Sequence, residues 1–362
     1  MIRLHYINDT IMIKIGQKEQ KIISLFLEKG SIQSSVVYKE LLKTGQSISL
    51  ITIKRALSIM AGQGLLVLSG SGRSTSYTLA VKGRIFASID AKKYCMIEPD
   101  KRFGLNSFNP NLFPEIPSEI FTDKEIKTLA DATLEYRHRT VDLSPVIQKK
   151  EMERLVIELS WKSSKIEGNT YTLLDTEKLI LEHQEAPGHD KSEAVMILNH
   201  KEAFNFIHDN VSQFQFLNRA NLEKLHAVMV KDLSVGLGLR KKPVGVIGSK
   251  YKPLDNIYQI EEAVEALARA VSKMHSPYSK ALLALLGISY IQPFEDGNKR
   301  TSRLMANALL LAHGLSPLSY RSVDENEYRE AILVFYELNS CMPFKNIFID
   351  QYDFATKNYV VK

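Results

Sequence analysis

The sequence predicts a mainly α-helical protein of two domains, with two short hairpins and, at the N-terminus, a strand or an arm. Three observations support this class. The 362 residues are 44% hydrophobic and 24% charged, an ordinary globular composition with enough apolar surface for real cores. Apolar residues recur at helical spacing along most of the chain. Alternating segments around glycine, which are typical of hairpins, occur only near residues 64–79 and 243–251.

The first domain, residues 1–97, has the pattern of a winged helix. Residues 1–15 alternate loosely and predict a strand or an arm. A glycine-rich turn, Ser69-Gly70-Ser71-Gly72-Arg73, separates two alternating segments and predicts a hairpin. Three helices followed by a hairpin form a winged helix, whose third helix enters the major groove of DNA. The expected helices and strands cover residues 17–29, 35–42, 49–63, 64–68 and 75–79.

The excess positive charge of the chain lies in its first hundred residues. This part holds 14 Lys and Arg against 7 Asp and Glu, whereas the other 262 residues hold 33 against 34. Such an asymmetry indicates contact with nucleic acid at one end of the molecule. Winged helices also serve as docking or dimerisation modules for proteins, and that alternative stays open. The residues expected to face DNA are Ser49, Thr52, Lys54 and Arg55 on the third helix and Arg73 at the wing tip.

A second, helical domain is expected over residues 121–362, after a proline-rich linker over 98–120. Thr122 and Glu125 form a capping box that opens its first helix. Ser144-Pro145 opens the next helix, since proline is favoured at the first helical position. Further helical patterns cover residues 193–208, 221–230, 260–274, 280–291, 304–312, 325–339 and 348–359.

Cysteine usage and hydropathy predict a cytoplasmic protein with no membrane partner. Cys95 and Cys341 are far apart and fit neither metal nor redox spacing, which favours a reducing compartment. No signal peptide is expected at the N-terminus. The longest uncharged apolar run, Ala281 to Ile291, is about half of the roughly 20 residues that a membrane span needs.

Residues Tyr290 to Arg303 form the most informative stretch. Pro293 ends the preceding helix, because the residue before a proline is pushed out of helical geometry. Gly297 allows the backbone to turn before the next helix begins. The stretch is therefore a short loop that leads into a helix N-terminus, where free N–H groups favour an anion.

The charges of this stretch strengthen the interpretation as an anion site. Lys299, Arg300 and Arg303 lie near the positive end of the helix dipole, where each cation costs roughly 0.3–1 kcal/mol. A bound anion would offset that cost. Asp296 is placed to hold a divalent cation against the anion, as carboxylates do for phosphate-bound Mg²⁺.

A second stretch, Ser163 to Asn169, places a negative charge near the C-terminal end of a helix, where the dipole is also negative. Ser163 and Glu167 are four residues apart and share a helix face. Gly168 is expected to stop the helix, which leaves Glu167 at the negative end of the dipole. The carboxylate therefore needs a cationic partner.

Residues 292–303 resemble the signature of the Fic family, His-Pro-Phe-x-(Asp/Glu)-Gly-Asn-(Gly/Lys)-Arg, with a second arginine three residues on. Every fixed position matches except the first, where Gln292 replaces the histidine. The resemblance, which covers roughly residues 121–359, implies binding of ATP with Mg²⁺ and transfer of AMP to a protein hydroxyl. The family's histidine is the general base. A primary amide cannot replace it, because it has no usable proton affinity near neutral pH.

The resemblance also implies roles for individual residues. Asp296 would hold Mg²⁺, and Gln292, Asn298 and Arg300 would occupy the catalytic positions. Glu167 would pair with Arg303 and block productive seating of the γ-phosphate. The phosphate-binding set would be Gly297, Asn298, Lys299, Arg300 and Arg303. The inhibitory motif would be Ser163, Glu167 and Gly168, and a hairpin flap of Val244, Gly245, Val246, Ile247 and Gly248 would hold the target segment by strand addition.

The sequence thus predicts a Fic-type adenylyltransferase that is inhibited by Glu167 and impaired by Gln292. An alternative is a catalytically silent, nucleotide-binding transcriptional regulator that acts through its winged helix. A third interpretation is that Gln292 was introduced to trap an active enzyme. The expected partners are ATP, a protein target that could be the chain itself, duplex DNA through residues 1–97, and a second copy of the chain.

Overall fold

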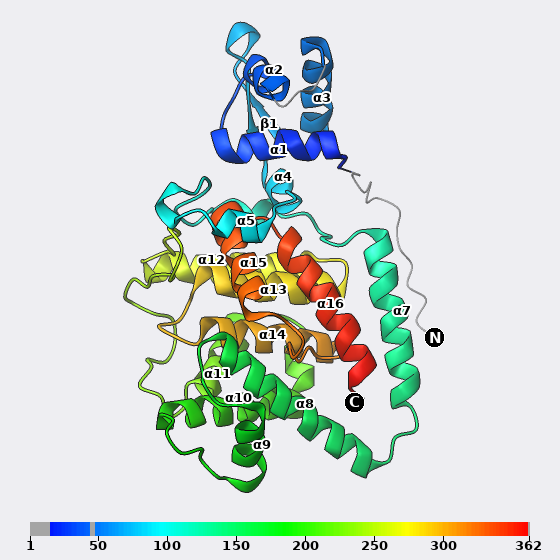
Figure 1. Cartoon of the computed structure of the whole chain (residues 1–362), viewed down its shortest axis with the longest axis vertical. Coiled ribbons are helices and arrows are strands. Elements are labelled where there is room, and N and C mark those ends of the chain that lie inside the picture. The colour runs from blue at the N-terminus through cyan, green and yellow to red at the C-terminus, as the bar shows by residue number, and fades with distance from the viewer. Residues whose placement is uncertain (1–14, 44–47, 361–362) are drawn as a thin grey trace.

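The computed structural model describes residues 15–43 and 48–360, and helices dominate it (Figure 1). The strand or arm expected over 1–15 lies outside the described residues, apart from Ile15. Within the described part of the chain, the sheet structure is one antiparallel pair, β1 (Leu66–Ser69) and β2 (Ser76–Leu79). None of the described helices is long and apolar enough to cross a membrane.

The N-terminal module contains three helices and the hairpin, in the order that the sequence predicts. Ser49 caps the third helix by accepting a hydrogen bond from the Thr52 amide. In the hairpin, Leu66 pairs with Leu79 and Ser69 with Ser76. Figure 1 shows the module at one end of the molecule. Its helices are α1 (Gln17–Lys29), α2 (Ser34–Lys43) and α3 (Leu50–Gly62), and they are followed by the short α4 (Val81–Ile85) and α5 (Ala91–Cys95).

The segment expected to be a linker, residues 98–120, is called the connecting segment below. It packs against the helical body. Leu112 and Phe113, in the short helix α6 (Leu112–Glu115), belong to the main hydrophobic core. Phe108 stacks on Tyr290 with ring centroids 5.1 Å apart. The Asn109 amide donates to the Tyr290 hydroxyl over 2.8 Å. The prolines of this segment therefore accompany an ordered chain that is fixed at several points.

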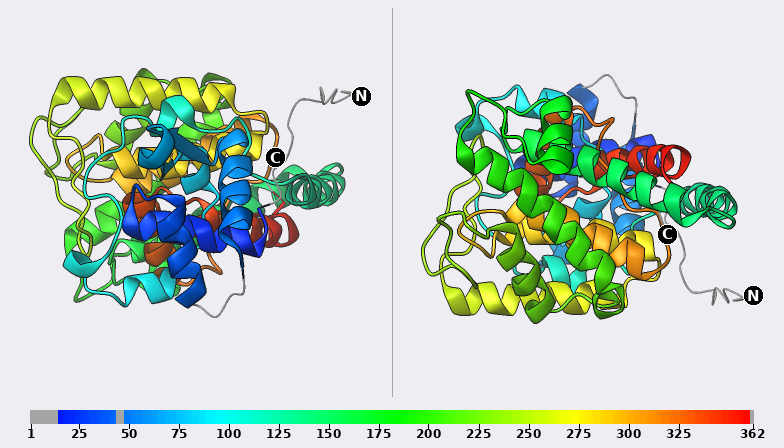
Figure 2. Two further views of the ribbon diagram at one scale, coloured as in Figure 1. Left: turned by 90° about the horizontal axis from the view of Figure 1, so that it is seen from above. Right: turned by 90° about the horizontal axis from the view of Figure 1, so that it is seen from below.

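The helical body is built around α13 (Pro277–Ile291), whose apolar residues are buried on every side. A helix that is hydrophobic all round belongs in a core, as this one does. It packs most extensively against α14 (Asn298–Ala312) and α12 (Ile257–Lys273). Figure 2 shows α7 (Asp123–Thr140) and the start of α8 (Pro145–Ile166) standing at one side of the body. The remaining helices are α9 (Leu173–Glu182), α10 (Lys191–Asp209), α11 (Arg219–Met229), α15 (Glu325–Leu338) and α16 (Met342–Asn358).

Local signals placed the long helices well. Thr122 and Glu125 form the capping box at the start of α7, and Ser144 caps α8 with Pro145 as its first residue. The last helix begins at Met342, six residues before the expected 348, because Pro343 occupies its first turn. Proline fits there, since the amide it lacks would have no partner inside the helix.

The hairpin expected over residues 243–251 is wrong as paired strands. A turn is present, with the Ser249 amide donating to the Val246 carbonyl over 3.3 Å, but its two arms form no ladder. The second arm pairs with the connecting segment instead, since the Lys252 amide donates to the Asn106 carbonyl over 3.0 Å. Pro243 and Gly245 in the first arm weaken strand pairing, because one lacks an amide hydrogen and the other has no side chain to pack.

Candidate active site

A loop of six residues, 292–297, joins α13 to α14 and forms the floor of the site. Gln292 ends α13 in the left-handed conformation, with φ of 51°, and Gly297 precedes α14 with φ of 78°. The Asn298 side chain closes the loop, because its oxygen accepts from the Phe294 amide over 2.8 Å and its nitrogen donates to the Phe294 carbonyl over 2.9 Å. Asn298 was expected in the catalytic set, and this geometry gives its side chain a positioning contact.

Two residues that sequence reasoning did not assign to the site hold this loop from outside. Arg240 is buried and donates from Nε to the Gln292 carbonyl over 2.6 Å, and its amide donates to the Pro293 carbonyl over 2.9 Å. His226 stacks on Phe294 at 3.7 Å, and its Nε2 lies 2.9 Å from the Asp296 carbonyl. Burial lowers the pKa of His226, so the ring stays neutral. No motif surrounds either residue, and only the fold brings them to the loop.

A cavity of about 290 Å³ lies above the start of α14. It gathers residues from the loop, from the end of α8 and from the segment 244–247, which are far apart in sequence. Ser163 and Arg303 do not line it, whereas most of the predicted nucleotide-binding residues do. Its lining comprises Glu167, Met196, Val244, Gly245, Val246, Ile247, Gln292, Glu295, Asp296, Gly297, Asn298, Lys299 and Arg300.

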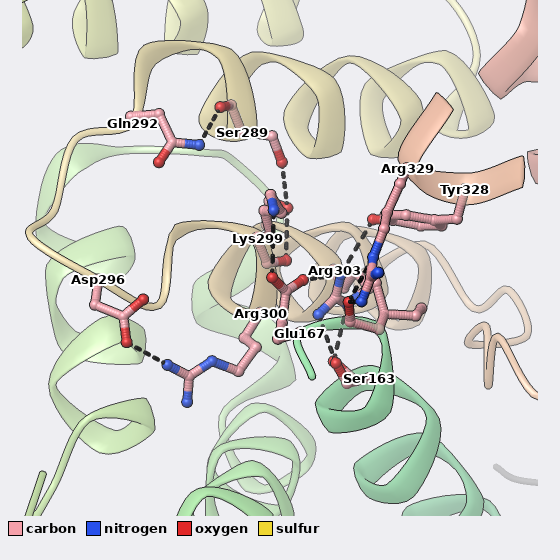
Figure 3. Close-up of polar contacts among 12 residues, drawn as sticks. Ser163, Glu167, Ser289, Gln292, Asp296, Lys299, Arg300, Arg303, Tyr328 and Arg329 are labelled. Atoms are coloured by element: carbon pink, nitrogen blue, oxygen red, sulfur yellow. Dashed lines mark hydrogen bonds and ion pairs between the residues drawn. The ribbon is translucent and has the colours of Figure 1, made fainter. Parts of the chain in front are cut away.

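Arg300 and Asp296 form an ion pair at the edge of the cavity, with Nη2 and Oδ2 2.9 Å apart (Figure 3). The Arg300 side chain is only 2% exposed, whereas that of Asp296 is 65% exposed. Nη1 of Arg300 has no hydrogen-bond partner among the described residues. A buried guanidinium with an unused N–H beside a cavity favours an anionic ligand, because the unmade hydrogen bond is costly.

Three carboxylates line the cavity. Glu167 contacts Arg303 and Lys299, and Glu295 accepts from the Gly236 amide over 3.2 Å. Asp296 is exposed and pairs with Arg300 through Oδ2, so it is the carboxylate best placed to bind a cation. Among the described residues, no group of three or more His, Cys, Asp or Glu side chains could hold a metal ion. Mg²⁺ is commonly held by one or two carboxylates together with substrate phosphates and water. The residues present therefore fit Mg²⁺ that arrives with a phosphate ligand, and they do not fit a metal held by the protein alone.

Glu167 caps the end of α8 and lies between two cations of α14. Its Oε1 is 2.9 Å from Arg303 Nη1, and its Oε2 is 3.4 Å from Lys299 Nζ (Figure 3). Burial would raise the pKa of Glu167, but the positive charges of Arg303, Lys299 and Arg300 hold that pKa below its usual range. The carboxylate is therefore ionised and fills the space between the cavity and Arg303.

Arg303 is completely buried and fully engaged. It donates from Nε to Ser163 Oγ and from Nη2 to the Ser163 carbonyl, both over 2.8 Å. Its Nη1 also reaches the Tyr328 hydroxyl, 3.3 Å away. Gly168 follows the C-cap of α8 with φ of 102°, which explains why a glycine ends this helix. The structure thus brings Ser163, Glu167 and Arg303 together from two helices.

The Gln292 side chain turns back onto the end of α13. Its Nε2 donates to the Ser289 carbonyl over 2.7 Å (Figure 3). The same nitrogen lies 3.3 Å from the Tyr336 hydroxyl. The amide therefore satisfies a carbonyl at the end of the helix while it remains at the cavity wall. The amide can donate and accept hydrogen bonds in this site, but it cannot act as a general base.

A second, more apolar cavity of about 340 Å³ adjoins the first and lies between the segment 246–247, the end of α8 and α15. Both cavities are lined by Glu167, Val246, Ile247 and Lys299. Tyr328, Ile332, Leu333 and Tyr336 of α15 complete the apolar wall. The pair of cavities thus offers a polar compartment next to an apolar one.

The five residues expected to face DNA lie on the N-terminal module, outside both cavities. Ser49, Thr52, Lys54 and Arg55 are exposed on α3, and Arg73 is exposed at the hairpin tip. Ser49 and Thr52 bond each other through their side-chain oxygens, 2.8 Å apart. The exposed side of α3 also carries Ile51 and Ile59, which are 76% and 54% exposed. It therefore offers apolar as well as cationic contacts.

Comparisons with known proteins identify the same region. Residues 216–310 match the Fic/DOC family. The chain is 26% identical to the protein adenylyltransferase Fic of Nematostella vectensis over 199 residues, which is 50% of this chain and 44% of that protein. It is 29% identical to the protein of the same name in Drosophila mojavensis over 166 residues, 45% of this chain and 33% of that protein. The chain thus spans less than half the length of these curated relatives.

Solved structures show the same fold. Fic-1 (residues 134–508) from C. elegans superimposes with a TM-score of 0.57 at 17% identity, over 66% of this chain and 72% of that one. A Fic domain containing signaling protein from Bacteroides thetaiotaomicron superimposes with a TM-score of 0.55 at 18% identity, over 64% of this chain and 94% of that one.

Proposed function

Residues 216–310 match the Fic/DOC family, and from this premise we propose that the site binds ATP and is built to transfer AMP to a protein hydroxyl. The observation that carries the proposal is the convergence of three groups on one cavity: the first amides of α14, which have no partner inside the helix, the unused N–H of Arg300 and the exposed Asp296 carboxylate. The curated relatives are named for the same reaction. The match of residues 216–310 covers the loop and most of α14.

The two adjoining cavities suit the two halves of a nucleotide. The polar cavity, at the amides of Gly297, Asn298 and Lys299, would take the phosphates. The apolar cavity between Tyr328, Ile332 and Tyr336 would take the base and ribose. Their shared border at Val246 and Ile247 is the flap segment, which would hold an extended segment of the target beside the phosphates.

In the proposed reaction, the target oxygen attacks the α-phosphorus, the bond to pyrophosphate breaks, and the hydroxyl proton passes to a base. Arg300 would bind the outer phosphates and oppose the charge of the leaving group. Mg²⁺ held by Asp296 would neutralise charge on the phosphates. Gln292 stands where the proton must leave and takes no proton near neutral pH. The chain as it stands is therefore an impaired transferase.

Glu167 opposes the reaction at a different step. Its carboxylate occupies Arg303 and Lys299, so a γ-phosphate would meet a negative charge where it needs cations. Productive seating of ATP would require Glu167 to withdraw. We therefore propose that the chain is inhibited by Glu167 as well as impaired by Gln292.

Calorimetry with ATP and Mg²⁺ tests the proposed site. Asp296→Ala and Arg300→Ala should each weaken binding, because a charge-assisted contact is worth about 1.5–3 kcal/mol. Arg269→Ala is the control, since that side chain lies exposed on α12 and lines neither cavity. Absence of nucleotide binding in the wild type and also in Glu167→Gly would refute the proposal.

A second candidate function is a silent, nucleotide-binding regulator that contacts DNA. The exposed cations Lys54, Arg55 and Arg73 and the charge excess of residues 1–100 favour it. Gln292 agrees with it, because such a regulator needs no base. The apolar side chains of Ile51 and Ile59 on the same helix favour docking of a protein, including a second copy of the chain.

Two free thiols, Cys95 and Cys341, agree with a cytoplasmic location for either function.

A further inference from the structure

Glu337, in the last turn of α15, is a completely buried carboxylate outside both cavities. Its Oε1 lies 3.2 Å from Arg102 Nη1 and accepts from Ser249 Oγ over 2.6 Å. Its Oε2 lies 2.7 Å from the Tyr94 hydroxyl. A buried carboxylate is costly unless it is paired and hydrogen-bonded, and the end of a helix adds an unfavourable dipole. Glu337 meets both requirements through donors from three separate segments.

The three donors belong to parts of the molecule with different tasks. Tyr94 lies on α5 and packs in the same hydrophobic cluster as the core of the N-terminal module. Arg102 lies in the connecting segment, and Ser249 follows the flap turn. Arg102 donates to the Cys95 carbonyl over 3.0 Å and to the Gly248 carbonyl over 2.9 Å. One guanidinium therefore joins the end of α5 to the flap turn.

Backbone contacts add to this connection. The Leu105 amide donates to the Glu337 carbonyl over 2.6 Å. Gly104 has φ of 109°, and a Cβ there would lie 2.4 Å from the same carbonyl oxygen, so only glycine allows this approach. Beyond the flap turn, the Tyr251 hydroxyl donates to the Tyr290 carbonyl over 2.8 Å, two residues before Gln292. The flap is thus anchored to α15, to the connecting segment and to α13.

We infer that Glu337 is a positioning residue for the flap. Through Tyr94 and Arg102, it makes the position of the flap depend on α5 and on the connecting segment. The task of the flap, holding the target segment, rests on the proposed function. The positional coupling does not rest on it. Because coupling between two sites is reciprocal, a ligand that shifts α5 would shift the flap, and a docked target would act back on α5.

Amide hydrogen exchange in the full chain tests this coupling. The reporters are the amides of Ser249 and Lys252, which donate to the Val246 and Asn106 carbonyls. Ser249→Ala should speed their exchange about tenfold or more, a factor that corresponds to about 1.4 kcal/mol. Ser249→Thr keeps a hydroxyl and should restore slow exchange. These variants are preferred to a change of Glu337 itself, whose complete burial puts folding at risk.

The decisive variant is Tyr94→Phe, which removes one hydroxyl on the far side of Glu337. It should also speed exchange at Ser249 and Lys252, although residue 94 lies in a distant part of the sequence. Tyr352→Phe is the matched control, because it removes a buried tyrosine hydroxyl that bonds Thr133 between α16 and α7. Equal flap exchange in Tyr94→Phe and Tyr352→Phe would overturn the coupling. Fast exchange in Ser249→Thr would overturn the role of the hydroxyl.

A titration of the same variants with ATP and Mg²⁺ separates this inference from the proposed function. Faster flap exchange, combined with no nucleotide binding by the wild type or by Glu167→Gly, would support the anchor at Glu337 and refute the transferase. Nucleotide binding, combined with unchanged flap exchange in Ser249→Ala and Tyr94→Phe, would support the nucleotide site and refute the anchor at Glu337.

Discussion

Glu167 and Lys299 each carry a charge that its own helix end disfavours. Glu167 caps the negative end of α8, and Lys299 lies in the first turn of α14. Alone, each would cost roughly 0.3–1 kcal/mol. Their contact at 3.4 Å, together with the Arg303 contact at 2.9 Å, offsets both costs. The residues that would hold the site inactive therefore also stabilise the fold.

This pairing predicts that Glu167→Gln destabilises the chain at neutral pH by about 1.5–3 kcal/mol, through the loss of a charge-assisted contact. The pKa of Glu167 is lowered in the folded state, so its contribution is fully present above the unfolded value of 4.5. The contribution is lost as the pH falls from that value through the folded pKa.

Urea unfolding of the wild type and Glu167→Gln between pH 7 and pH 3.5 measures this effect. The difference in the free energy of unfolding should be constant above about pH 5 and should shrink below it. Glu135→Gln, at an exposed position of α7, is the control and should show little difference at any pH. If the difference in the free energy of unfolding between the wild type and Glu167→Gln increased as the pH fell, the ion pair would be contradicted.

At the scale of elements, the loop between α13 and α14 depends on backbone that few residues adopt. Gly297 has φ of 78° and lies under Val230, whose Cγ1 would be 3.2 Å from an added Cβ. The left-handed conformation costs a non-glycine residue roughly 1–2 kcal/mol. The direction of the first amides of α14 depends on this residue.

Gly297→Ala should therefore lower the free energy of unfolding by about 1–2 kcal/mol and weaken binding of ATP with Mg²⁺. The matched control is Gly62→Ala at the end of α3, which lines neither cavity and where no atom lies within 4 Å of an added Cβ. Chemical denaturation and calorimetry on both variants give the comparison. Similar stability losses in the two variants would show that the loop conformation is not under this constraint.

Elements with signals in their own sequence were predictable. The capping box of Thr122, the Ser144-Pro145 start of α8 and the stop at Gly168 all lie within a few residues of the boundaries that they set. The flap was mispredicted as a hairpin because its second arm pairs with Asn106, which lies about 145 residues earlier. Pairings across such distances leave no local pattern.

The same distinction applies to the candidate site. The contact between Glu167 and Arg303 could be anticipated, because each charge is unfavourable at its own helix end and a family motif joins the two. Arg240 and His226 could not be, since they hold the loop from remote segments and through backbone carbonyls, which any sequence supplies. Nothing in the sequence indicated that the Asn298 amide would be used to close the loop on Phe294.

Across the whole molecule, the excess positive charge and the proposed active site lie in different parts. The excess positive charge belongs to residues 1–100, whereas the cavities lie in the helical body. Figure 1 shows α3 at the end of the molecule, on the N-terminal module. A ligand of this module would thus bind apart from the nucleotide, and the contacts of Glu337 offer a path between the two.

If this module binds DNA, the affinity of the full chain for duplex DNA should fall steeply with rising salt, because phosphate contacts release counterions. Charge reversal at Lys54 and Arg55 should abolish binding, whereas reversal at Lys357, on α16, should change it little. Fluorescence anisotropy at several salt concentrations measures the salt dependence of the affinity and the effect of each charge reversal. Binding that is absent or independent of salt would favour protein docking through Ile51 and Ile59.

We propose that one site is silenced at two steps: Glu167 opposes the seating of ATP, and Gln292 removes the base. Transfer of label from α-labelled ATP to the chain itself tests it most directly, in the wild type, Gln292→His, Glu167→Gly and the double variant. A general base is typically worth 10²–10⁴-fold. Gln292→His should stay weak while Glu167 remains, and Glu167→Gly should bind ATP better without transferring AMP.

The double variant should label itself clearly more than either single variant, and more than their separate effects combine to give, because both residues act on one reaction. Labelling by Glu167→Gly at the rate of the double variant would show that Gln292 does not limit catalysis. That result would contradict silencing of the site by both residues.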